Sequence, residues 1–221
     1  MNFFIDTNVP IGYTVPHDKW HENSVNFIEN ADEPIFWSTF VKKEYSDTLE
    51  NIVDNIEIFL NSINKILKNN EKDFSNYTSF ENFIIKQTSD CKLDIIKKTK
   101  LLEKFWEKNN FIEVISEELY IKFNQFSRDI RNVYYSRELV LENILFLHDC
   151  GLDNYLRYKN CATWLCNGGV HKSDCKVVLD AHDCGLIHDD LSFVSNDDEL
   201  LELISKLGTS HLEIVEFRSC N

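Results

Sequence analysis

The stretch "FFIDTNVPIGYT", residues 3–14, decides the fold that we predict for this chain. Its first apolar residues run directly into Asp6, Thr7 and Asn8. A short apolar run that is bounded by polar turn residues is typical of a buried strand. We therefore predict a strand over residues 2–6, and this strand ends in a carboxylate.

Strands and helices are predicted to alternate at both ends of the chain. The predicted elements are, in order, a helix within 17–31, a strand over 33–39, a long helix from Val41, a helix over 171–185, a strand from Leu191, a helix over 197–208 and a strand over 211–217. Alternation of this kind at the two ends predicts a parallel sheet that is assembled from both of them.

The middle of the chain is predicted to be helical. Apolar residues recur there at helical spacing, including the long stretch 116–151, and residues 68–82 are the predicted loop. The predicted fold class is therefore α/β, with a parallel-sheet, three-layer α/β/α core and a large all-helical insertion. We assign residues 1–50 and 165–221 to the core, and residues 51–164 to an insertion that packs on it.

The composition supports this fold class and limits the partners. The chain has 221 residues, 43% of them apolar, but only 6 Gly and 3 Pro, which argues against an all-β fold with its frequent turns. The net charge of −14 is unusual for a nucleic-acid binder. Residues 91–176, however, carry 14 basic and 12 acidic groups. This segment either contacts phosphate groups or forms an ordinary solvated helical surface.

We expect a cytoplasmic protein that has no membrane contact. No signal peptide is recognisable, and no apolar run approaches the ~20 residues of a membrane span. Seven irregularly spaced cysteines favour reduced thiols over a disulfide framework. Cys161, Cys166, His171 and Cys175 are residue types of a structural zinc site, but their spacing matches no common zinc module, so we expect ordinary thiols.

Four acidic residues are predicted to lie at the carboxyl edge of the sheet. Asp6 and Asp197 follow strands, whereas Glu44 and Asp174 lie in the first turns of helices. Sites of open parallel sheets form at this edge, because loops and helix starts converge there. Clustered carboxylates repel one another, and a divalent cation with a preference for oxygen ligands relieves that repulsion. The four acids therefore predict a site for Mg²⁺ or Mn²⁺.

The motifs "FFIDTNV", "STFVKKEYSDTL", "HKSDCKVVLDA" and "LSFVSNDDEL", in this order, resemble the four acidic motifs of PIN-domain nucleases. The resemblance covers roughly residues 2–50 and 168–217, and the helical middle has no counterpart in the minimal family fold. The family's metal-binding catalytic acids fall on Asp6, Glu44, Asp174 and Asp197. Its supporting polar positions, which orient an acid or the attacking water, fall on Asn8 and Ser195.

The resemblance implies a Mg²⁺- or Mn²⁺-dependent endoribonuclease, either the toxin of a toxin–antitoxin pair or an RNA-processing factor. A carboxylate-bound metal would activate a water molecule to attack the phosphorus, and the products would carry a 5′-phosphate and a 3′-hydroxyl. The expected partners are an RNA substrate and, as open alternatives, an antitoxin, another protein or a second copy of the chain.

Other assignments of these acids are open. Asp47 could replace Glu44 as a ligand, and Asp198 could replace Asp197, with either of the latter two capping the following helix. An alternative function is a non-catalytic PIN-like module that binds protein or RNA. A phosphatase of the haloacid dehalogenase class would need a second acid two residues after Asp6, and position 8 is Asn.

RNA contact is also predicted for a few basic residues. In "RDIRNVYYSR", residues 128–137, arginines interleave with tyrosines, a composition suited to phosphate contact and base stacking. The predicted RNA-binding residues are Arg128, Arg131, Arg137 and Lys172. Helix packing with partly buried arginines would explain the same pattern.

Overall fold

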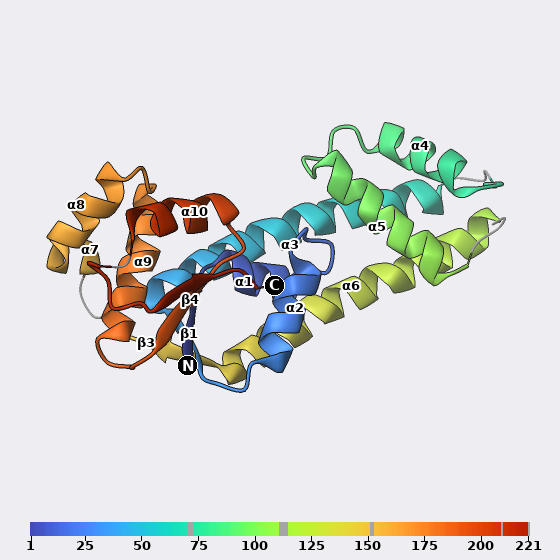
Figure 1. The fold of residues 1–221 in the computed structure, drawn as a ribbon. Coiled ribbons are helices and arrows are strands. Elements are labelled where there is room, and N and C mark those ends of the chain that lie inside the picture. The colour runs from blue at the N-terminus through green and yellow to red at the C-terminus, as the bar shows by residue number, and fades with distance from the viewer. Residues whose placement is uncertain (70–72, 111–114, 151–152, 209, 221) are drawn as a thin grey trace. The chain divides into compact units, whose positions relative to one another are not determined.

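A computed structural model describes residues 1–69, 73–110, 115–150, 153–208 and 210–220. Within these residues five strands form one all-parallel sheet in the order β3-β2-β1-β4-β5 (Figure 1). The strands are β1 (Asn2–Ile5), β2 (Ile35–Ser38), β3 (Leu145–His148), β4 (Leu191–Val194) and β5 (Glu216–Arg218). The fold is therefore α/β, and a long helical stretch lies between β2 and β3.

The helices are α1 (Asn8–Thr14), α2 (His21–Asn30), α3 (Thr39–Lys68), α4 (Tyr77–Gln87), α5 (Ile95–Lys108), α6 (Ser116–Ile144), α7 (Asn154–Arg157), α8 (Lys159–Asn167), α9 (Lys172–Gly185) and α10 (Asp198–Leu207). The start of α3 has a recognisable cap, since the Ser38 hydroxyl accepts a hydrogen bond from Val41 N at 3.1 Å. This contact fixes the point where β2 gives way to α3.

The central strand of the sheet is β1, which pairs with β2 on one side and β4 on the other. Phe4 and Ile5 are fully buried, as are Phe193 and Val194 in β4. Ile5 lies opposite Val194 in register, so the residues that follow them meet at one edge of the sheet. This register is what brings residue 6 next to residue 195.

The predicted strands near residues 2–6, 33–39 and 191 are confirmed, as is the helix over 171–185. The prediction of one helix over 116–151 is wrong at its end, because residues 145–148 form β3. In β3, Leu145 and His148 are buried while the two residues between them are exposed. The run "LVLENILFLHDC" is apolar at helical spacing as well, so periodicity alone could not separate α6 from β3.

Two further boundaries differ from the predictions. The final strand is β5 at Glu216–Arg218, not 211–217, and α4 begins at Tyr77 inside the loop that we predicted over 68–82. The α4 start has its own signal, because the Asn76 side chain accepts a hydrogen bond from Ser79 N at 2.9 Å. Boundaries of short elements depend on such side-chain contacts more than on apolar pattern.

The chain divides into two compact units. One unit consists of residues 1–48 and 137–221 and contains the whole sheet, and the other consists of residues 49–136. The helical unit is thus shorter than the predicted insertion, since residues 137–164 belong with the sheet. The aromatic core of the helical unit includes Phe59, Phe74, Phe80, Phe105 and Phe123, all fully buried.

No helix among the described residues is both long enough and apolar enough to cross a membrane.

Candidate active site

Asp6 lies directly after β1 and is held by hydrogen bonds from two sides. Thr7 N donates to its Oδ1 at 2.6 Å, while Asn8 Nδ2 and Ser195 Oγ donate to its Oδ2 at 2.6 and 2.8 Å. Thr7 and Asn8 follow β1 in the chain, whereas Ser195 follows β4. The parallel pairing of these two strands therefore fixes the orientation of the Asp6 carboxylate.

Burial raises the pKa of Asp6 from 3.8 to about 6. Hydrogen bonds from Ser195 and Thr7 lower this pKa, and the negative charges of Asp174 and Glu44 raise it. Two of the other predicted acids, Asp174 and Glu44, thus act electrostatically on Asp6 at the carboxyl edge of the sheet. Ionising Asp6 in the folded protein therefore requires more free energy than ionising an ordinary aspartate, and this is the main electrostatic property of the site.

Glu44 joins this group through Thr7. It lies in the second turn of α3, and the Thr7 hydroxyl donates to Glu44 Oε2 at 2.5 Å. The same residue therefore contacts two acids, Asp6 through its backbone N–H and Glu44 through its side chain. The sequence indicates Thr7 only as a polar turn residue after the strand, and its contact with Glu44 is not visible there.

Asp174 lies in the first turn of α9 and is half-buried. Its Oδ1 accepts a hydrogen bond from Ser173 Oγ at 3.1 Å. The helix begins after His171, whose side chain accepts from Ser173 N. A carboxylate in this position is favourable for the α9 dipole, and the same position lets Asp174 act on Asp6.

Asp197 is the N-cap of α10. Its Oδ1 accepts hydrogen bonds from Glu199 N and Leu200 N at 3.0 and 3.1 Å, and its own N–H donates to Ser195 Oγ at 3.0 Å. Asp198 is exposed in the first turn of the same helix. Of the two acids, Asp197 is therefore the one tied to the Asp6 cluster, through Ser195.

Asn8 and Ser195 connect the ends of the two central strands. Asn8 Nδ2 donates to Asp6 and lies 3.0 Å from Ser195 Oγ, and Asn8 Oδ1 accepts from Asn196 N at 2.8 Å. Ser195 is fully buried. Both side chains thus hold the Asp6 carboxylate, which is the contact that the sequence resemblance implied for them.

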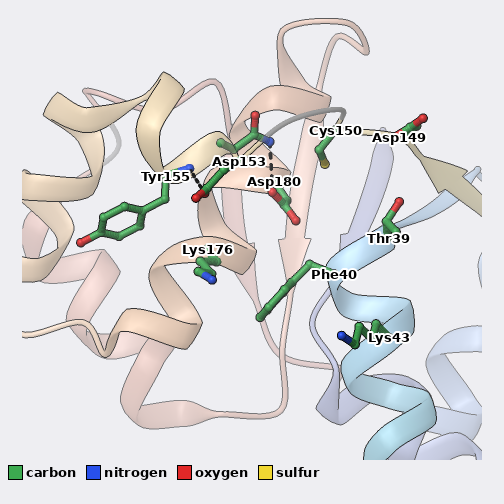
Figure 2. Close-up of a pocket in the computed structure, with 10 residues that line it drawn as sticks. Thr39, Phe40, Lys43, Asp149, Cys150, Asp153, Tyr155, Lys176 and Asp180 are labelled. Atoms are coloured by element: carbon green, nitrogen blue, oxygen red, sulfur yellow. Dashed lines mark hydrogen bonds between the residues drawn. The ribbon is translucent and has the colours of Figure 1, made fainter.

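A pocket of about 320 Å³ lies in the same unit, and none of the four predicted acids lines it (Figure 2). Its lining comes from the start of α3, the residues after β3, and α9: Thr39, Phe40, Lys43, Asp149, Cys150, Asp153, Asn154, Tyr155, Lys176 and Asp180. Lys43 immediately precedes Glu44, and Lys176 lies two residues after Asp174. The Lys176 ammonium lies 5.3 Å from the centroid of the Phe40 ring. The pocket therefore combines two lysines and aromatic surface with three aspartates of its own, Asp149, Asp153 and Asp180.

Asp180 forms the buried wall of this pocket. Burial raises its pKa, while hydrogen bonds from Ser38, Asn154 and Cys150 lower it, and Asn154 Nδ2 lies 3.0 Å from its Oδ1. Asp180 lies six residues after Asp174 in α9, so the two side chains point to different sides of the helix. Its contacts with Ser38 and Asn154 are those of a residue that ties α9 to the end of β2 and to α7.

The arginines with predicted RNA contacts mostly have partners within the protein. Arg131 contacts Glu57 and Asn61, each at 3.0 Å, and Arg137 donates to Tyr13 O at 2.7 Å. Arg128 and Lys172 are exposed, and Lys172 Nζ lies 5.7 Å from the Tyr155 ring centroid. RNA contact stays a prediction for all four; Lys172 is the one beside the pocket.

Within the described residues, two sets of three His, Cys, Asp or Glu side chains bring their ligand atoms within 4.8 Å of one another. Neither set includes an acid of the Asp6 cluster. Among the described residues, therefore, no three of the four predicted acids bring their carboxylate oxygens within 4.8 Å of one another.

Comparisons of the chain with protein-family models, with curated proteins and with solved structures found no match.

Proposed function

We propose that the chain is a Mg²⁺- or Mn²⁺-dependent endoribonuclease of PIN type that hydrolyses phosphodiester bonds in RNA. The observation that carries the proposal is the environment of Asp6, a carboxylate at the end of the central strand whose pKa is raised to about 6 by burial and by two neighbouring acids. A divalent cation would favour the ionised form of all three groups.

The hydrogen bonds to Asp6 leave one acceptor site of its carboxylate available for a cation. A carboxylate oxygen has about two acceptor sites. Asp6 Oδ2 accepts from Asn8 and Ser195, whereas Oδ1 accepts from Thr7 N. One acceptor site on Oδ1 is thus not needed by these contacts. The donor set of carboxylate oxygens also matches the hard ligands that Mg²⁺ and Mn²⁺ prefer.

Asp6, Glu44 and Asp174 would hold the cation, and Asp197 could contribute Oδ2, since both of its cap bonds use Oδ1. When bound, the metal would supply Lewis-acid activation of water and charge stabilisation for the leaving oxygen. Asn8 and Ser195 hold Asp6 in one orientation, and Thr7 holds Glu44. These contacts preorganise the acids before substrate binds.

The pocket of Figure 2 supports RNA as the polymer. Lys43 and Lys176 would contact backbone phosphates, and the faces of Phe40 and Tyr155 would stack on bases. Such contacts are weakly dependent on sequence, because every base has a face on which an aromatic ring can stack. The pocket therefore favours single-stranded RNA.

The proposal is tested by cleavage of a panel of single-stranded RNAs of mixed sequence in the presence of Mn²⁺. Wild-type protein should cleave the panel, and Asp6→Asn should reduce cleavage to the level without metal. Asp198→Asn is the matched control, because it removes the same charge from an exposed acid near the site. We expect this control to cleave at the wild-type rate.

Equal cleavage by wild type and Asp6→Asn would refute the proposal. If wild type neither cleaves any RNA nor binds Mn²⁺ in a calorimetric titration, the alternative of a non-catalytic protein- or RNA-binding module takes its place.

A further inference from the structure

A second group of possible metal ligands lies where β3 ends beside α9. Its members are the five side chains His148, Cys150, Asp183, Cys184 and His188. His148 is the last residue of β3, Cys150 follows it, and the other three come from the end of α9 and the turn after it. None of them belongs to the predicted set of four acids, Asp6, Glu44, Asp174 and Asp197.

His148, Cys184 and His188 bring one ligand atom each within 4.8 Å of one another. His148 and Cys184 are buried, and His188 is half-buried with its ring stacked on Phe36 at a centroid distance of 4.4 Å. Around a tetrahedral zinc ion, nitrogen and sulfur ligands lie roughly 3.3–3.8 Å apart. Side-chain movements of about 1 Å would therefore close this trio around one ion.

Cys150 is the candidate for a fourth ligand. Its ligand atom lies within 4.8 Å of those of His148 and Asp183, so His148 is common to the two sets. Together with the trio it completes a set of two cysteines and two histidines, which is a common composition of structural zinc sites.

The members of each pair are close in sequence. His148 is the last residue of β3, and Cys150 lies two residues beyond it. Cys184 and His188 are four residues apart, and His188 N donates to Cys184 O at 2.9 Å, so the helical turn continues between them. Both pairs thus have the spacing that lets two side chains reach a common point.

Asp183 orients the shared histidine. Arg157 Nη1 and the Tyr158 hydroxyl donate to Asp183 Oδ1, and Nε2 of His148 lies 3.1 Å from Asp183 Oδ2. A histidine that donates one ring N–H to a carboxylate keeps its other ring nitrogen for a metal, an arrangement that recurs around zinc-bound histidines.

We propose that His148, Cys150, Cys184 and His188 bind one zinc-class cation, which fastens the edge strand β3 to α9. The nitrogen and sulfur ligands select Zn²⁺ or Co²⁺ over Mg²⁺ and Mn²⁺. This site is therefore distinct from the acidic cluster, and it does not depend on the nuclease proposal. Its role is structural, because all four ligand positions are filled by the protein.

The sequence carries an independent sign of this site. The pentapeptide His-Asp-Cys-Gly-Leu occurs twice, at 148–152 and at 182–186. The first copy provides His148 and Cys150, and the second provides Cys184 together with Asp183.

The test is a titration of the full chain with Co²⁺ after dialysis against a chelator. We expect one equivalent of Co²⁺ to give a thiolate-to-cobalt charge-transfer band and the intense visible bands of a four-coordinate site. Added Zn²⁺ should displace the Co²⁺ and abolish these bands. Cys184→Ser should abolish the charge-transfer band or reduce it strongly. His188→Gln, at a half-buried position that tolerates change, should weaken Co²⁺ binding at least tenfold.

Two controls separate this site from other thiols and from the acids. Cys220→Ser removes a buried thiol elsewhere in the same unit, and Asp6→Asn removes the central acid; both should leave the band unchanged. Circular dichroism verifies that each variant is folded. Absence of the band in wild type would overturn the proposal, as would a band that His188→Gln leaves at full affinity.

Discussion

At the scale of single residues, the candidate site depends on how Asp6 is held. From the sequence, Asp6, Asn8 and Ser195 could be placed together, because two parallel strands end beside one another. The role of Thr7 could not be predicted, since its contact with Glu44 depends on where α3 starts relative to β1. The choice between Asp197 and Asp198 likewise needed the cap geometry of α10.

The pH dependence of stability should reveal Asp6. In the folded protein Asp6 holds its proton up to about pH 6, whereas its ordinary pKa is 3.8. Folding is therefore favoured by protonation, and stability falls as pH rises through this window. The loss is roughly 3 kcal/mol, at 1.36 kcal/mol for each pKa unit.

Denaturant unfolding of wild type and Asp6→Asn between pH 4 and pH 7 measures this effect. The variant should gain stability relative to wild type as pH rises. The side-chain amide of the Asp6→Asn variant also meets the donors Thr7 N and Asn8 Nδ2, which lowers the stability of the variant by the same amount at every pH. This constant loss does not affect how the stability difference changes with pH. A pH-independent difference between the two proteins would contradict the raised pKa.

Thr7→Val removes the hydroxyl that holds Glu44 while keeping the shape of the side chain. Loss of an outer contact to a metal ligand should reduce Mn²⁺ affinity and RNA cleavage by about 10–100-fold. Thr163→Val, which changes an exposed threonine in α8, is the control and should have no effect. The measurement is the Mn²⁺ concentration that gives half-maximal cleavage, and an unchanged value for Thr7→Val would exclude this role.

At the scale of elements, the sequence predicted the strands that are bounded by polar residues and missed the one that is not. β1 ends at Asp6 and β4 at the polar run from Ser195, so both have visible ends. β3 follows α6 without a break, and its two exposed residues, Phe146 and Leu147, are apolar. Its strand conformation comes from pairing with β2, which is a tertiary contact that local pattern does not contain.

The end of α9 depends on a close approach that only glycine permits. A Cβ on Gly185 would lie 1.8 Å from the backbone oxygen of Glu213, so Gly185→Ala would force the backbone segments apart. We expect it to destabilise the protein by about 3 kcal/mol or more, the upper range for overpacking.

Gly168→Ala is the matched comparison. There a Cβ meets only the end of the Leu207 side chain, which can rotate away. Thermal unfolding should therefore show a much smaller loss for Gly168→Ala than for Gly185→Ala. Equal losses at the two positions would contradict the packing of α9 against residue 213.

At the scale of the whole molecule, the fold class was predictable and the division of the chain was not. The α/β class follows from strand–helix alternation at both ends. The compact units, however, divide α3 and α6 near residues 48 and 136, within continuous helices. The apolar pattern of the sequence does not change at residues 48 and 136, because a helix keeps its period of about 3.6 residues when it passes from one unit into the other.

The net charge of −14 would make the proposed RNA binding sensitive to a few lysine side chains. With a net charge of −14, binding should depend on local basic residues such as Lys43 and Lys176. In the Asp6→Asn background, Lys43→Gln and Lys176→Gln should each weaken RNA binding. Each should also reduce the slope of log K against log salt by about 0.7.

Lys206→Gln is the control for these two variants. Lys206 is an exposed lysine of α10 that pairs with Glu202 at 3.1 Å. Its affinity and salt slope should match those of the parent in fluorescence-anisotropy titrations over a range of salt. A common effect of all three lysine variants would indicate a nonspecific role of charge and would contradict the pocket as the RNA site.

The most direct test of the central claim is to determine the chemical ends of RNA that has been cleaved in the presence of Mn²⁺. Hydrolysis by a metal-activated water predicts fragments with a 5′-phosphate and a 3′-hydroxyl, formed by wild type and not by Asp6→Asn. Fragments with 2′,3′-cyclic phosphates, or the same fragments from both proteins, would contradict the account.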